Sequence, residues 1–135
     1  MSRPRVDDLA DLPSNCVRPL GALLPAILRE WAHKAGHRYV EIDCSGVRDK
    51  KGVLAAIGRA FGFPDWYGAN LDALYDCLTD LPDNRAVAGY VVALLKLPYS
   101  QEFDVEQRDA LIDVFRDAAD AYADQGIALR VLYSS

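Results

Sequence analysis

Two acidic side chains with an aromatic one between them form the first candidate site in this sequence. Asp72 and Asp76 are four residues apart in a segment, 70–81, whose apolar residues recur at helical spacing. Both therefore lie on one side of a predicted helix, with Tyr75 between them. Paired carboxylates can transfer protons, hold a divalent cation, or bind the cationic groups of another protein.

Catalysis is the least supported of these roles. General acid–base chemistry needs two carboxylates in different environments, whereas Asp72 and Asp76 share one exposed helix face. His33 and His37 have no acidic or cysteine neighbour at metal-ligand spacing, and the sequence has no glycine-rich phosphate loop, G-x-S-x-G or H-E-x-x-H motif. Cys77 falls on the apolar side of its helix, as a small core residue does. We therefore predict no enzyme, no cofactor and no metal site. A hydrolase that uses the two aspartates with weakly held Mg²⁺ is the lowest-ranked alternative.

A protein-binding role gains support from the aromatic residues near this helix. Trp66 and Tyr67 lie in a short loop between Pro64 and the helix, and Gly68 follows them. Either ring taken alone would more often be a core anchor, but a loop bounded by proline and glycine favours exposure of one of them. Aromatic side chains beside fixed charges are typical of the residues that dominate protein interfaces.

A second acidic stripe is predicted on the helix over 105–125. Its acidic residues fall within about 40° either side of one line along the helix, and Arg108 and Arg116 are its only basic residues. A helix face that carries charges of one sign lacks the stabilisation that opposite charges one turn apart provide. Two acidic faces in one small domain predict a negative field that steers a basic partner. The stripe consists of Glu106, Asp109, Asp113, Asp117, Asp120 and Asp124.

Composition and charge restrict the function further. The 135 residues carry 20 acidic and 15 basic side chains, a net charge of −5, so a nucleic-acid partner is not expected. The longest apolar run, 86–95, is shorter than the roughly 20 residues that span a bilayer, so no membrane partner is expected. The first eight residues have no apolar signal-peptide core, and the three cysteines show no disulfide or zinc spacing. We expect a cytoplasmic protein with reduced thiols.

The elements that must position these residues alternate between strands and helices. Residues 1–17 show no clear period and are predicted to form a loose arm. The three predicted strands, with helices between them, are typical of a small parallel sheet with right-handed crossovers. The predicted elements are a helix over 19–35, a strand over 39–43, helices over 50–61 and 70–81, a strand over 87–97, a helix over 105–125 and a strand over 127–133. The strand over 39–43 is predicted from its alternation, and the apolar run over 87–97 is typical of a strand buried on both faces. Asp49, Asn70 and Asp104 are the predicted N-caps of the three later helices, and Asp104 with Gln107 resembles a capping box.

The segment 63–80 resembles the barstar family of intracellular ribonuclease inhibitors. The family pattern is an aromatic residue, Tyr-Gly-x-Asn-Leu-Asp-Ala-Leu, a second aromatic residue and Asp-Cys-Leu, and this chain matches it from Trp66 to Leu78. The resemblance continues more weakly around 114–117 and in the order of elements. It divides the chain into an N-terminal arm and extra helix over 1–36 and a barstar-like domain over 37–135.

The resemblance implies a fold and a mode of action. It implies an α/β fold with a three-stranded parallel sheet packed by helices. It also implies that the loop near 66–69 and the helix that follows block a ribonuclease active site, with the Asp76 carboxylate where the substrate phosphate would lie. The implied partner-binding residues are Trp66, Tyr67, Gly68, Asn70, Asp72, Tyr75, Asp76, Thr79, Asp80 and Asp117.

The expected function is therefore that of a non-enzymatic inhibitor of a ribonuclease or a nuclease-like toxin, of the antitoxin or immunity type. Four positions depart from the family pattern and bear on which partner is bound. Ala69 replaces an acid, Tyr75 a tryptophan, Trp66 a tyrosine and Asp117 a glutamate. The alternative is an acidic regulatory module that binds a basic protein other than a nuclease.

Overall fold

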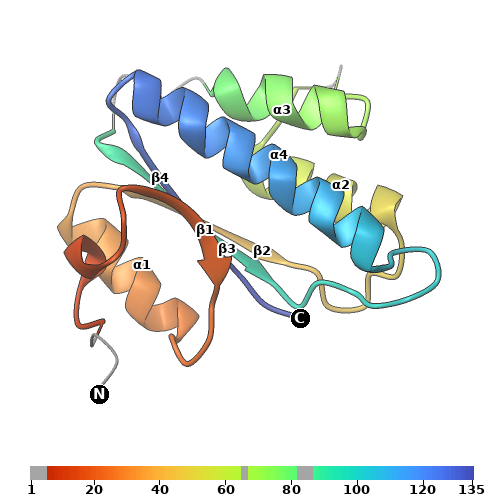
Figure 1. Cartoon of the computed structure of the whole chain (residues 1–135), viewed down its shortest axis with the longest axis horizontal. Coiled ribbons are helices and arrows are strands. Elements are labelled where there is room, and N and C mark those ends of the chain that lie inside the picture. The colour runs from red at the N-terminus through yellow and green to blue at the C-terminus, as the bar shows by residue number, and fades with distance from the viewer. Residues whose placement is uncertain (1–5, 65–66, 82–86) are drawn as a thin grey trace.

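The computed structural model describes residues 6–64, 67–81 and 87–135, and its centre is a wholly parallel four-stranded sheet (Figure 1). The strand order is β1-β4-β3-β2. The strands are β1 (Asn15–Pro19), β2 (Arg38–Asp43), β3 (Gly89–Leu95) and β4 (Ala128–Tyr133). The helices are the 3₁₀ turn η1 (Leu9–Asp11), α1 (Pro25–Lys34), α2 (Lys50–Phe61), α3 (Leu71–Thr79) and α4 (Val105–Asp124).

Helices cover both faces of the sheet. Figure 1 shows α1 on one side and α2, α3 and α4 on the other. The apolar run of β3 divides between the two sides, since successive side chains of a strand point to opposite faces. Val92 packs in the core beneath α2, α3 and α4, whereas Val91 packs with Leu28 of α1. The prediction that this strand is buried on both faces is confirmed.

The sheet has four strands rather than the three expected, because the N-terminal arm is not loose. Residues Asn15–Pro19 form β1, which pairs in parallel with β4 from Asn15 opposite Leu129 to Pro19 opposite Tyr133. A proline is tolerated there because β1 is an edge strand. The Asn15 side chain adds two bonds, with Nδ2 donating to the carbonyls of Ala119 (2.9 Å) and Ile127 (3.0 Å).

Helix boundaries follow the capping residues closely. The predicted caps are confirmed, since the Asp49 side chain accepts from the Gly52 amide and Asn70 from the Ala73 amide, and Asp104 forms a capping box. The helix expected from residue 19 instead begins at Pro25, whose fixed φ suits the first position of a helix. No helix in the described part of the chain is long and apolar enough to cross a membrane.

The layer made by α1 and η1 is expected to contribute directly to stability. Leu28 has no exposed surface and packs among Leu9, Val91 and Leu132. We expect Leu28→Ala to lower the free energy of unfolding by about 2–5 kcal/mol, since it removes buried methyl groups and leaves a cavity. Urea denaturation followed by circular dichroism measures this. Leu24→Ala, at a position 63% exposed, is the control and should change stability by less than about 0.5 kcal/mol. Equal midpoints for the two variants would contradict the prediction.

Candidate protein-binding site

The exposed face of α3 presents the acidic and aromatic side chains together. Asp72, Tyr75 and Asp76 are exposed, whereas the opposite side of the helix is buried in the core through Leu74 and Leu78. The orientation predicted from helical spacing is therefore correct. Within the described residues, the carboxylates of Asp72 and Asp76 take part in no hydrogen bond or ion pair, so both remain available to another molecule.

Helix α3 is held at its start and along its buried side. Asn70 Oδ1 accepts a hydrogen bond from the Ala73 amide (2.8 Å), so this predicted partner-binding residue serves as the N-cap of α3. Near the other end, the Tyr122 hydroxyl of α4 donates to the Leu78 carbonyl. Asp72, in the first turn, also interacts favourably with the N-terminal end of the helix dipole. The exposed carboxylates thus project from a fixed backbone.

Tyr67 anchors the loop that precedes α3. Its hydroxyl donates to the Leu54 carbonyl (3.0 Å), and its ring packs edge-on against Phe63 with centroids 4.9 Å apart. A Cβ added at Gly58 would lie 2.7 Å from Tyr67 Cε2, so glycine makes room for the ring. Burial raises the pKa of Tyr67 to about 12, with a smaller contribution from Cys77. Tyr67 is thus half-buried and positions the loop.

The remaining predicted residues occupy varied environments. Gly68 and Asp80 are exposed, and Trp66 lies outside the described residues. Thr79 is half-buried, and its hydroxyl donates to the carbonyls of Tyr75 (2.9 Å) and Asp76 (3.3 Å) within the helix. That hydroxyl is therefore engaged inside α3.

Asp117 and the other acidic residues of α4 are exposed along their length, as the helical spacing predicts. Opposite them, Leu111, Phe115 and Tyr122 are buried against the sheet. One member of the stripe is partly neutralised within the helix, since Arg116 Nη1 lies 3.2 Å from Asp113 Oδ1. Helices α3 and α4 pack side by side (Figure 1), so the two acidic helices form one region of the molecule.

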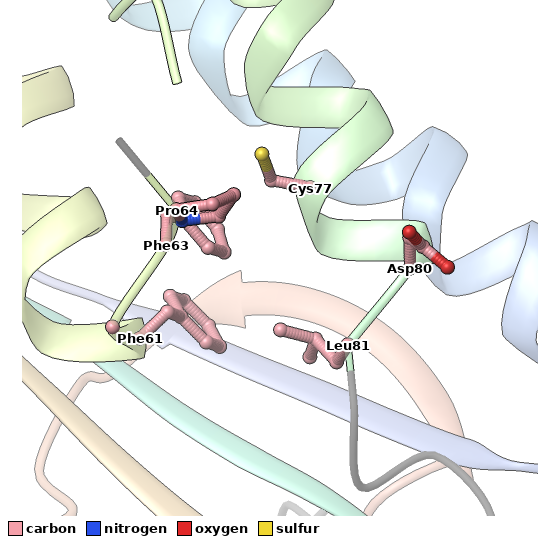
Figure 2. A pocket seen from close by; sticks show the side chains of 7 residues that line it. Phe61, Phe63, Pro64, Cys77, Asp80 and Leu81 are labelled. Atoms are coloured by element: carbon pink, nitrogen blue, oxygen red, sulfur yellow. The ribbon is translucent and has the colours of Figure 1, made fainter. Parts of the chain in front are cut away.

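A pocket beside α3 was not predicted from the sequence. It has a volume of about 280 Å³ and lies where the ends of α2 and α3 approach each other (Figure 2). Cys77 on its wall is buried, and that burial, followed by the charges of Asp76 and Asp80, raises the pKa of the thiol. The thiol is therefore protonated at neutral pH, as expected of a core cysteine and not of a nucleophile. No sequence signal marks this pocket, because it depends on how two helix ends pack.

The described residues offer little to a metal ion. They contain no group of three or more histidine, cysteine or acidic side chains placed to hold one. Cys16, Cys44 and Cys77 are free thiols. The chemistry that the face of α3 offers is thus the binding of cations by exposed carboxylates.

The anchoring role of Tyr67 gives a stability prediction. Tyr67→Phe removes the hydroxyl that binds the Leu54 carbonyl while keeping the ring in place, so it should lower the free energy of unfolding by about 0.5–1.5 kcal/mol. Thermal or urea denaturation measures the change. Tyr75→Phe, which removes a hydroxyl from an exposed ring of the same helix region, is the matched control and should have no effect. A larger loss in the control than in Tyr67→Phe would show that the loop is held in another way.

Two comparisons with known proteins bear on this geometry. A family model described as Barstar (barnase inhibitor) matches residues 37–134, which run from just before β2 to just after β4. The putative ribonuclease inhibitor YrdF of Bacillus subtilis (strain 168) is 36% identical over 66 residues, which are 47% of this chain and 65% of that relative. This match covers just under two thirds of the relative's length. Because the family model matches well over half of the chain, the chain belongs to the barstar family.

Proposed function

We propose that this chain inhibits a ribonuclease by occupying the active site of the enzyme with α3 and the loop before it. The supporting observation is the Asp76 carboxylate, which is exposed and, within the described residues, unpaired on a capped and packed helix. A ribonuclease cleft holds a phosphate with cationic side chains, and a carboxylate offers those cations two oxygens in short, charge-assisted hydrogen bonds. A carboxylate on a helix cannot be cleaved as RNA is, so the enzyme is blocked and the inhibitor needs no catalytic activity of its own.

The proposed contact surface comprises the exposed face of α3, the preceding loop and Asp117 of α4. Asp72, Tyr75 and Asp76 on α3 and Asp80 at its C-cap are the proposed direct contacts of the helix, and Trp66 and Gly68 are those of the loop. Asn70, Tyr67 and Thr79 contribute by fixing the backbone that carries these contacts. We further propose that residues 37–135 form the inhibitor domain, that residues 1–36 are an addition to it, and that the protein acts in the cytoplasm.

A regulatory module that binds a basic protein other than a nuclease is the second candidate. The exposed acidic stripe of α4 favours it, because such a stripe attracts any strongly basic partner. The two candidates differ in their effect on RNA cleavage. An inhibitor abolishes RNA cleavage at one molecule per enzyme, whereas a regulatory module leaves RNA cleavage unchanged.

The first functional prediction concerns Asp76. We expect Asp76→Ala to weaken inhibition of a barnase-type ribonuclease by about 2–5 kcal/mol, because a cation in the cleft loses its partner while remaining desolvated. Cleavage of RNA by the enzyme, titrated with the inhibitor, measures the change. Glu30→Ala is the matched control, since it alters the net charge equally but lies on α1, on the opposite face of the sheet. Equal inhibition by wild type and Asp76→Ala would refute the proposed mode of binding.

The second functional prediction concerns ionic strength. Steering by the acidic faces of α3 and α4 should make association with the ribonuclease slow markedly between low and physiological salt, because the Debye length falls from about 30 Å at 0.01 M to about 8 Å at 0.15 M. Dissociation, governed by short-range contacts, should change much less. Stopped-flow mixing gives both rates. An association rate that does not depend on salt would argue against electrostatic steering.

A further inference from the structure

The pocket between the ends of α2 and α3 has the size of a site for a single side chain. Its volume of about 280 Å³ is just below the roughly 300–1,000 Å³ of pockets that hold whole small molecules. It borders the exposed face of α3, because Asp80 belongs to both. Figure 2 shows its two sides, Phe61, Phe63 and Pro64 from the α2 end and Cys77, Asp80 and Leu81 from the α3 end.

The α2 side of the pocket is aromatic. The rings of Phe61 and Phe63 are stacked, with centroids 5.2 Å apart and planes 7° apart, and Phe63 remains half-buried. A surface of this kind takes the methylene stem of a long basic side chain, which buries its apolar part while its head stays polar. The face of an aromatic ring also attracts a cation.

The α3 side of the pocket supplies negative charge. The Asp80 carboxylate is exposed at the rim and, within the described residues, takes part in no hydrogen bond or ion pair. Burial, and then the charges of Asp76 and Asp80, raise the pKa of Cys77, so the thiol on the wall is neutral. A neutral thiol and a free carboxylate beside aromatic walls complement a cation with an apolar stem.

We propose that this pocket receives an arginine side chain of the partner protein, with the guanidinium on Asp80 and the stem against Phe61 and Phe63. Arginine fits better than lysine, because its planar fork can bind a carboxylate through two parallel hydrogen bonds and can stack on a ring. That the arginine belongs to a ribonuclease rests on the proposed function, whereas the preference for an arginine side chain rests on the residues that line the pocket. Asp80 caps the C-terminal end of α3 four residues after Asp76, so an arginine here would lie next to the end of the exposed face that carries Asp76. It would serve to discriminate among ribonucleases that share a similar active site.

A small probe tests the pocket without any nuclease. The full chain, labelled for NMR, is titrated with N-acetyl-arginine amide and, in parallel, with N-acetyl-norleucine amide, which has the apolar stem without the guanidinium. We expect saturable shifts at Phe63, Cys77 and Leu81 with the arginine probe and not with the norleucine probe. Asp80→Asn should weaken arginine binding by about fivefold, near the upper end of what an exposed ion pair contributes. Glu30→Gln, which changes the net charge equally on the opposite side of the sheet, should leave it unchanged.

Three results would overturn the proposal. They are an absence of saturable shifts at the pocket, equal binding of both probes, and equal binding of the arginine probe by wild type and Asp80→Asn. A lysine probe that bound as tightly as arginine would overturn the preference for a guanidinium. The binding test of the pocket and the inhibition test of the proposed function can fail independently of each other. A chain that binds the arginine probe but inhibits no ribonuclease contradicts only the proposed function, and a chain that inhibits but does not bind the probe contradicts only the pocket.

Discussion

The place of the Asp76 carboxylate depends on the apolar contact that holds α3 against α4 and the sheet. Leu74 and Leu78 are buried along this contact, and the Leu78 carbonyl accepts a hydrogen bond from Tyr122 of α4. An anion that replaces a phosphate in the cleft of another protein binds best when its position is fixed in advance, because ordering a mobile segment on binding offsets part of the interaction energy. The sheet supports α4 and α4 supports α3, so these contacts fix the helix that carries Asp76.

The same charges that suit a basic partner weaken the free helix. Asp72 and Asp76 repel each other across one turn, at a cost of a few tenths of a kcal/mol. The N-cap at Asn70 and the buried contacts of Leu74 and Leu78 each contribute more than this. The repulsion is therefore tolerated in the free protein, and cations of the proposed partner would relieve it. The helix keeps its shape through packing while its exposed face remains free to be strongly acidic.

Local sequence patterns predicted those strands and helix starts that depend on residues close together in the chain. Alternation identified β2, an apolar run identified β3, and the capping residues located three helix starts, all of which the structure confirms. Strand β1 was missed because Asn15–Pro19 shows no alternation and becomes a strand only by pairing with the free edge of β4. From the sequence, core anchoring is the more frequent role expected of such a ring, but the way in which Tyr67 is anchored could not be predicted, for a similar reason. It requires the space above Gly58 and the Leu54 carbonyl, and both become neighbours of the ring only after folding.

The second face of the sheet explains why the chain needs its N-terminal segment. A strand as apolar as β3 must be covered on both sides, and α2, α3 and α4 all lie on one of them, so the segment before β2 has to cover the other. The segment also provides one hydrogen-bond acceptor for a buried cation, since Arg130 Nη2 donates to the Leu12 carbonyl (3.3 Å). Because this layer and the face of α3 lie on opposite sides of the sheet, substitutions in α1 act on the stability of the domain without touching the proposed contact surface. The N-terminal layer therefore stabilises the sheet beneath α3 independently of which side chains the exposed face of α3 carries.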